Sequence, residues 1–159
     1  MDIARVFIAL GSNLGDRRGN IEKALDMLGH EGMAEVIKVS SLYETDPVGG
    51  PAQDKFLDGV AEVRTALTPH ALLKYLKKIE ARVGRTPSDV KWAPREIDLD
   101  ILLYNDVVIT DSELTIPHSL LHLRMFMIEP LAQIAPDVLH PVLGKTAAAI
   151  KKELSEGNQ

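Results

Sequence analysis

Strand-like and helix-like patterns follow one another along this chain in an order that few folds can accommodate. Strand-like runs at residues 3–10, 35–45, 56–67 and 96–104 are separated by helix-like runs at 20–29 and 69–84. The second and third strands have no helix between them, so we expect them to pair antiparallel. The order β-α-β-β-α-β predicts an α+β fold, a ferredoxin-like sandwich of an antiparallel sheet with helices, carrying additions at its C-terminal end.

Length and composition narrow the class of protein. The chain has 159 residues without an internal repeat or linker, so we expect a single domain over residues 1–159. Its net charge of −5 argues against binding to nucleic acid or to an anionic membrane. It contains no cysteine, which excludes disulfides and thiolate metal sites, and we see neither a signal peptide nor a membrane-spanning run. We therefore expect a soluble, cytoplasmic protein. Separately from composition, we expect it to act as a monomer.

Two aspartates stand where the fourth strand begins. The stretch WAPREIDLDILLY, residues 92–104, places Asp98 and Asp100 one leucine apart. Residues two apart on a strand project from the same face, and two buried carboxylates side by side repel unless a cation lies between them. A pair of Mg²⁺ ions would satisfy both, because Mg²⁺ binds carboxylate oxygens together with water and phosphate. The alternative is a solvated strand edge, but the apolar residues that follow favour the metal site.

Arginines and one lysine gather near this acidic pair. The basic residues within reach are Arg82, Arg85, Lys91, Arg95 and, after a turn, Arg124. Arginine is well suited to phosphate because its planar guanidinium group donates two parallel hydrogen bonds. A solvated basic loop is the alternative for any single residue. Together with the acids, the group predicts a polyanion bridged by metal.

Three weaker motifs are open to other interpretations. His118 and His122 have the spacing of a helical metal pair, but the glutamate of H-E-x-x-H is missing, so zinc is disfavoured. His118 is better interpreted as a phosphate or nucleotide contact, or as a structural residue, and His122 as a surface residue. The run LGKT at 143–146 resembles the end of a P-loop, but Leu139 stands where the first glycine should be. The run GSNLGD at 11–16 alone predicts only a turn.

Taken in order, several segments resemble a known enzyme family. The segments GSNLGD, TDPVGGPAQDKFLDGV, IEARVGR, WAPREIDLDILL and IPHSLLHLRMFMIEPLAQIAP occur in the same order in 6-hydroxymethyl-7,8-dihydropterin pyrophosphokinase. The resemblance covers residues 6–141, and the pattern W-x-P-R-x-x-D-x-D-I is its most specific part. It implies an enzyme of folate biosynthesis in which the pterin hydroxymethyl oxygen attacks the β-phosphorus of ATP and AMP leaves.

The resemblance also implies which residues act on ATP. Asp98 and Asp100 match the ligands of two Mg²⁺ ions that hold the triphosphate. Arg85 and Arg95 match arginines that act on the phosphates, so these four residues form the expected catalytic set. The residues that match the nucleotide site are Lys77, Glu80, Arg85, Trp92, Arg95, Ile101, Thr115, His118 and Arg124.

On the pterin side, the resemblance implies an aromatic sandwich. Phe56 and Phe126 match a ring pair that stacks on both faces of the flat pterin. Trp92 matches a tryptophan on a loop that closes over both substrates and excludes water. The residues that match the pterin site are Thr45, Val48, Phe56, Asp58, Trp92, Asp98 and Phe126.

The chain departs from the family at a few positions. Asp58 stands where the family usually has asparagine, and a carboxylate can only accept hydrogen bonds. Lys77 replaces a common glutamine. Pro87 and Ser88 replace an arginine and a lysine, so the loop that would close over the substrates is less basic than in the family. Two other functions stay open: a two-metal nucleotidyltransferase that would release pyrophosphate, and a ferredoxin-like module that binds a small molecule without turnover. An RNA-binding module is disfavoured by the acidic charge and the lack of aromatic RNP stretches.

Overall fold

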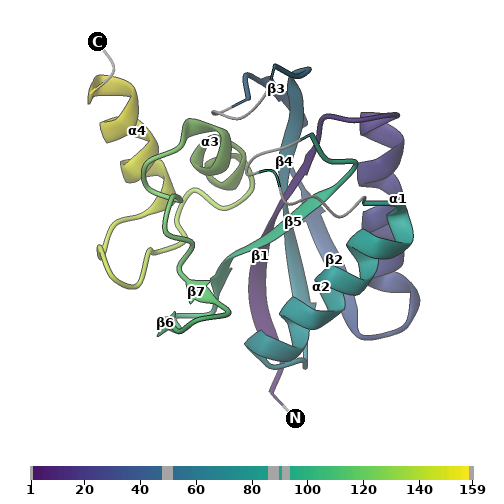
Figure 1. Cartoon of the computed structure of the whole chain (residues 1–159). Coiled ribbons are helices and arrows are strands. Elements are labelled where there is room, and N and C mark those ends of the chain that lie inside the picture. The colour runs from purple at the N-terminus through teal and green to yellow at the C-terminus, as the bar shows by residue number, and fades with distance from the viewer. Residues whose placement is uncertain (1, 48–51, 86–89, 91–93, 158–159) are drawn as a thin grey trace.

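The computed structural model describes residues 2–47, 52–85, 90 and 94–157, and Figure 1 shows how the elements are arranged. The elements are β1 (Ala4–Ser12), α1 (Arg17–His30), β2 (Ala34–Val39), β3 (Tyr43–Thr45), β4 (Phe56–Thr65), α2 (Pro69–Val83), β5 (Asp98–Tyr104), β6 (Ile109–Thr110), β7 (Thr115–Ile116), α3 (Met125–Ile134) and α4 (Ala147–Gly157). Within the described ranges, no helix combines the length and the apolar composition that crossing a bilayer requires.

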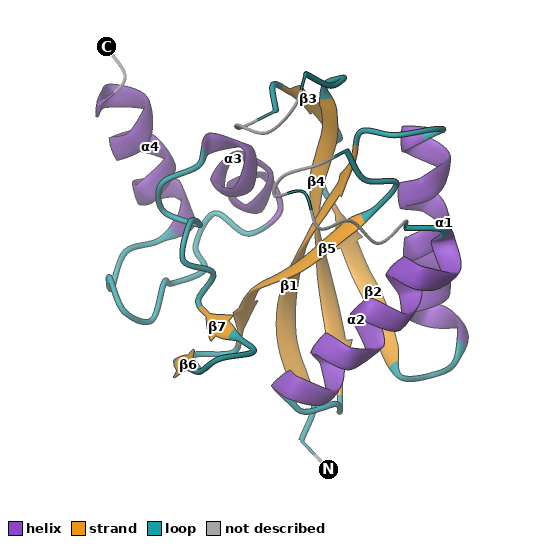
Figure 2. Cartoon of the chain, viewed as in Figure 1, coloured by secondary structure: helices purple, strands orange, loops and turns teal. Residues whose placement is uncertain are grey.

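The main sheet has the predicted topology. Its strands run in the order β2-β4-β1-β5, every neighbouring pair is antiparallel, and the short β3 also pairs with β4. Helices α1 and α2 lie on one face of the sheet, whereas α3 and α4 lie on the other (Figure 2). This arrangement confirms the predicted ferredoxin-like α+β fold with C-terminal additions.

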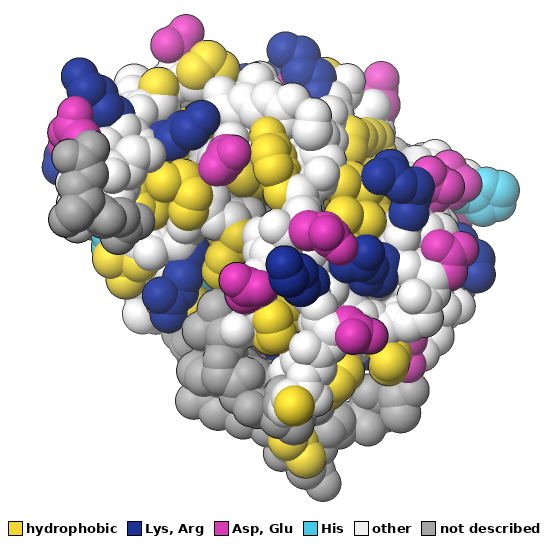
Figure 3. All heavy atoms as spheres, turned by 90° about the horizontal axis from the view of Figure 1, so that it is seen from above, with side chains coloured by type: hydrophobic (Ala, Val, Ile, Leu, Met, Phe, Trp, Pro, Cys, Tyr) yellow, Lys and Arg dark blue, Asp and Glu magenta, His cyan; other side chains and the backbone are white. Residues whose placement is uncertain are grey.

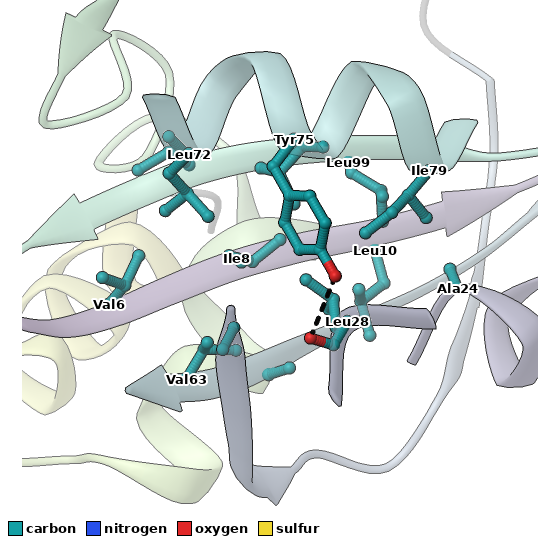
Figure 4. Packing of buried hydrophobic residues seen from close by; sticks show 14 of the residues in the cluster. Val6, Ile8, Leu10, Ala24, Leu28, Val63, Leu72, Tyr75, Ile79 and Leu99 are labelled. Carbon is teal, nitrogen blue, oxygen red and sulfur yellow. Dashed lines mark hydrogen bonds between the residues drawn. The ribbon is translucent and has the colours of Figure 1, made fainter. Parts of the chain in front are cut away.

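Alternation along the strands produces two apolar layers. Val6, Ile8 and Leu10 of β1 point toward α1 and α2, as Figure 4 shows, and are at most 1% exposed. The hydroxyl of Tyr75 on α2 donates to the carbonyl oxygen of Met27 at 2.9 Å and lies 3.4 Å from that of Leu28. The second layer joins the opposite face of the sheet to the two C-terminal helices through residues such as Phe7, Val60, Leu102, Met127, Ile128, Leu131 and Ile150. The sheet is therefore covered by helices on both faces.

Capping hydrogen bonds mark where α1 and α2 begin, whereas only one of the two predicted glycine stops ends a helix. Thr68 caps α2 as predicted, accepting a hydrogen bond from Ala71 N at 3.3 Å, and Gly84 ends the helix with φ of 121°. Helix α1 starts earlier than predicted because Asp16 accepts from Gly19 N at 3.0 Å, and it continues one residue past Gly29.

The predicted strand at 35–45 is divided in the structure. Residues 40–42 leave the regular ladder between β2 and β3. Ser40 explains the break, since its backbone N donates to Val60 O at 2.9 Å and its hydroxyl accepts from Val60 N at 2.9 Å. A side-chain oxygen thus replaces a backbone partner at this point. Helix α3 was not predicted, because the region after residue 116 shows no clear period.

Candidate active site

A cavity of about 240 Å³ lies between the sheet and the segment that leads into α3. Its floor is made of small β1 residues, Ala9 and Gly11, and their neighbours on β4 and β5 supply its functional side chains. The predicted site residues that line it are Thr45, Phe56, Asp58, Arg95, Asp98, Asp100, His118, Arg124 and Phe126. Residues far apart in sequence meet here because alternate residues of adjacent antiparallel strands share one face.

Asp98 and Asp100 project from the same face of β5, as their spacing predicted. Asp98 forms ion pairs with Arg85 Nη1 at 3.1 Å and Arg95 Nη1 at 3.0 Å. Burial, together with the negative charges of Asp98 and Glu80, raises the pKa of Asp100 to about 8 against the opposing charge of Arg95. Two carboxylates in such a place have an unfavourable charge that a divalent cation would relieve.

The donor set suits Mg²⁺ more than a metal that needs an all-protein cage. Among the described residues, no group of three or more histidine or carboxylate side chains is placed to hold a metal ion. Mg²⁺ commonly binds through one or two carboxylates and takes water and substrate phosphate for its other positions. Asp98 and Asp100 fit that pattern.

Glu80 connects the end of α2 to the start of β5. One of its carboxylate oxygens, Oε2, accepts from Leu99 N at 2.8 Å and pairs with Arg85 at 2.8 Å. Burial raises the pKa of this carboxyl, while the Leu99 N–H and the Arg85 charge lower it. Glu80 therefore holds Arg85 beside Asp98 while lying 7% exposed.

Asn13 holds Arg95 from the other side, and the interpretation of GSNLGD as a simple turn missed it. Arg95 N donates to Asn13 Oδ1 at 2.9 Å, and Asn13 N donates to Arg95 O at 3.1 Å. The Asn13 amide nitrogen also donates to Gln53 Oε1 at 2.6 Å and to Asp54 O at 3.1 Å. The buried asparagine thus joins the segment before β5 to the segment before β4. Nothing in the local pattern distinguishes it from an ordinary turn residue.

The other end of the cavity, its aromatic end, has aromatic rings and a buried acid, Asp58. Phe56 comes from β4 and Phe126 from α3, so a ring lies on the sheet side and another on the helix side. The hydroxyl of Thr45 donates to Asp58 Oδ2. Burial raises the pKa of Asp58 to about 6, with the Thr45 bond lowering it and the charge of Asp98 raising it. A flat ligand with hydrogen-bond donors on one edge would suit this end.

His118 lies in the cavity wall as a neutral imidazole. Its backbone N donates to Leu102 O at 3.0 Å, and its Nδ1 accepts from Leu120 N at 3.1 Å. Burial lowers the pKa of the ring, against the opposing effect of Asp98. Since Nδ1 accepts, the ring proton sits on Nε2, which can donate to an anion.

Some predicted residues lie away from the cavity. Ile101 is 3% exposed and belongs to the apolar layer beneath α1 and α2. Lys77 lies on the exposed side of α2, and Thr115 is exposed on β7. The predictions for Val48 and Trp92, and the departures at Pro87 and Ser88, fall outside the described residues.

The expectation that His122 is a surface residue holds only in part, because the residue is half-buried. Its Nδ1 is buried and has no hydrogen-bond partner among the described residues, and its ring lies 5.9 Å from that of His140 in an edge-on arrangement. His140 is distant in sequence, so a local pattern could not show this contact.

Comparison with known proteins identifies the family to which the chain belongs. The model of the family described as 7,8-dihydro-6-hydroxymethylpterin-pyrophosphokinase (HPPK) matches residues 7–136. The 2-amino-4-hydroxy-6-hydroxymethyldihydropteridine pyrophosphokinase of Aquifex aeolicus is 44% identical over 151 residues, which are 95% of this chain and 92% of that protein. The enzyme of the same name from Bacillus subtilis is 45% identical over 132 residues, covering 83% of this chain and 78% of the relative.

Solved structures support the fold at lower sequence identity. The crystal structure of an HPPK-DHPS protein in complex with substrates has a TM-score of 0.75 at 15% identity and covers 99% of this chain. This chain spans 44% of that longer protein, so the match shows the fold of one part of it. With a family model matched over most of its length and relatives above 40% identity, the chain belongs to the HPPK family of folate-synthesis enzymes, the pyrophosphokinases of hydroxymethyldihydropterin.

Proposed function

We propose that this protein transfers pyrophosphate from ATP to 6-hydroxymethyl-7,8-dihydropterin, with Asp98 and Asp100 holding two Mg²⁺ ions. The observation that carries the proposal is one cavity with two different ends. Half-buried carboxylates and their arginine partners lie at one end, and Phe56 and Phe126 lie at the other. A triphosphate and a flat heterocycle placed in these ends would meet in the middle.

The acidic end suits the electrostatics of phosphoryl transfer. When bound, Mg²⁺ would neutralise charge on the triphosphate and align it for in-line attack. Arg85 and Arg95 already lie within 3.1 Å of Asp98, close enough to turn toward phosphate oxygens once cations compensate the acids. The hydroxymethyl oxygen loses its proton and forms a bond to the β-phosphorus, the bond from that phosphorus to the α-phosphate oxygen breaks, and AMP leaves.

The aromatic end would bind and orient the pterin. Its ring would stack between Phe56 and Phe126, in the offset geometry that aromatic rings favour. Asp58 would accept hydrogen bonds from the amino group and ring N–H on the pterin edge, while Thr45 orients the carboxylate. Val48 and Trp92 remain proposed contacts.

Nucleotide contacts surround the acidic end in this proposal. His118 and Arg124 line the cavity, and Glu80 adjoins it through Arg85. Lys77, Ile101 and Thr115 remain proposed contacts to the nucleotide, further from the phosphates. On the face seen in Figure 3, acidic and basic side chains are interspersed over the described part of the surface. This distribution favours small-molecule substrates over a nucleic-acid backbone, and we propose that the enzyme acts on them as a monomer.

A product assay tests the reaction. With Mg²⁺, ATP and hydroxymethyldihydropterin, we expect AMP and a pterin diphosphate in equal amounts. Release of pyrophosphate would indicate a nucleotidyltransferase instead, and binding of the pterin without consumption of ATP would indicate a sensor. Formation of ADP would also overturn the proposal.

Variants of the acidic pair test the metal site. Asp98→Ala and Asp100→Ala should abolish turnover while circular dichroism shows an intact fold. Asp106→Ala is the matched control, because Asp106 is an exposed aspartate in the turn that directly follows β5. Substantial residual activity in both site variants would refute the metal assignment.

A further inference from the structure

The aromatic end of the cavity, where we propose that the pterin binds, has two walls that come from different parts of the fold. Thr45, Phe56 and Asp58 belong to β3 and β4, whereas Phe126 and Met127 belong to α3. A flat ring fits between two aromatic rings only if the walls keep a fixed separation, within roughly 0.5 Å of the productive geometry. Something must therefore set the position of α3 relative to β3.

Apolar packing alone does not set this position. Met127, Ile128 and Leu131 of α3 are at most 5% exposed and pack onto the sheet. Such contacts hold the helix on the sheet, but the hydrophobic effect is non-directional and defines the helix position less sharply than hydrogen bonds do. Strand β3 is short, with three residues, and within the sheet it pairs with β4 alone.

Gln133 makes a directional connection between α3 and the segment that enters β3. Its Oε1 accepts from Ser41 N at 2.9 Å and from the Tyr43 hydroxyl at 3.0 Å, and its Nε2 donates to Ser41 Oγ at 2.8 Å. Gln133 lies seven residues after Phe126, so both side chains leave α3 on the same side after about two turns. Thr45 follows Tyr43 by two residues on β3.

The segment that Gln133 binds is itself fixed against the sheet. A Cβ atom at Gly59 of β4 would lie 2.8 Å from Leu42 Cδ2 and 3.1 Å from Ser40 Oγ. Residues 40–42 therefore pack directly on the β4 backbone and cannot move closer. Because this segment packs closely on β4, the three hydrogen bonds of the Gln133 amide relate the C-terminal end of α3 to the sheet.

We propose that Gln133 is a positioning residue for the pterin pocket, holding the α3 wall with Phe126 at a fixed distance from the β3 wall with Thr45. The inference rests on the proposed function for the identity of the ligand. Gln133 itself is exposed and lines neither the aromatic end nor the acidic end of the cavity. Its loss should therefore weaken pterin binding selectively and leave the binding of nucleotide unchanged.

The test compares the binding of two ligands to the wild-type protein and to four variants. Calorimetry would measure the Kd of 6-hydroxymethyldihydropterin with a saturating non-hydrolysable Mg-ATP analogue, and the Kd of the analogue alone. For Gln133→Ala we expect pterin binding about five- to tenfold weaker, as the loss of one or two net hydrogen bonds implies, with nucleotide binding within about twofold. Tyr43→Phe, which removes one of the three bonds, should weaken pterin binding about two- to threefold.

Two further variants separate positioning from general loosening. Gln133→Glu should restore pterin affinity to within about twofold, because Ser41 N–H and both hydroxyl groups can all donate to a carboxylate. Glu129→Ala is the matched control on α3, since the structure records no hydrogen bond or ion pair of its side chain among the described residues. It should leave both dissociation constants unchanged.

Distinct outcomes would overturn the inference or the proposed function. Pterin affinity within twofold of wild type in a folded Gln133→Ala protein would overturn the inference. An equal loss of affinity for pterin and nucleotide would overturn it as well, and so would failure of Gln133→Glu to restore pterin binding. Wild-type protein that binds pterin and nucleotide yet forms no AMP would overturn the proposed reaction while leaving the positioning test valid.

Discussion

Asp58→Asn is expected to stabilise the protein, and to do so only above acidic pH. Burial raises the pKa of the Asp58 carboxyl from 3.8 to about 6 in the folded protein, and the side chain is 8% exposed. The folded state therefore holds this proton more tightly than the unfolded chain does, so stability falls as pH rises from about 4 to about 6. At about 1.4 kcal/mol for each pKa unit, the ionised carboxylate lowers the free energy of unfolding by up to roughly 3 kcal/mol at pH 7.5.

The asparagine side chain of the variant is an amide that cannot ionise, so the substitution removes this loss of stability while changing the shape of the side chain little. Asparagine has nearly the same volume, stays neutral, and can still accept the hydrogen bond from Thr45. Urea unfolding in the presence of EDTA, at several pH values from 4 to 7.5, should give equal stabilities at pH 4 and a growing advantage for the variant toward pH 7.5. Asp46→Asn, at a neighbouring side chain that is 86% exposed, should show no such pH dependence. A difference that is constant with pH, or a variant less stable at pH 7.5, would refute the reasoning.

Three other substitutions probe the floor of the cavity and the apolar layer. Gly11→Ala places a Cβ atom 2.8 Å from Asp58 Oδ1, so calorimetry should show pterin binding weakened about tenfold, with unchanged affinity contradicting the geometry. Tyr75→Phe removes the hydrogen bond to Met27 O and should lower the free energy of unfolding by about 1 kcal/mol in urea. Leu76→Ala empties a site of 0% exposure and should cost about 2–5 kcal/mol in the same measurement, and a loss below 1 kcal/mol would show that the cavity collapses.

Prediction from sequence succeeded where the signal was local. Thr68 and Gly84 mark the ends of α2 through capping and a left-handed backbone, both of which depend on neighbouring residues. Asp98 and Asp100 share a face because strand residues alternate, which needs no knowledge of the fold. The order of elements followed from the same local periods and was sufficient for the sheet topology.

Prediction failed where a partner distant in sequence decides the outcome. Helix α3 is covered by the sheet on one side and by α4 on another, so its apolar residues are too many to show a helical stripe. The division of the strand at 35–45 depends on Ser40 finding Val60. His122 is half-buried with its ring edge-on to His140, a contact that its own neighbours in sequence do not show.

Periodicity and residue type are properties of the chain alone, so the fold class, the family and the chemistry offered by the acids, arginines and phenylalanines could be predicted without a structure. How these groups act on one another depends on contacts between elements. The raised pKa of Asp100, the bond from Thr45 to Asp58 and the position of α3 set by Gln133 each require residues from separate elements. Burial and distance control charge and hydrogen bonding, and both arise only when the sheet and helices close around the cavity.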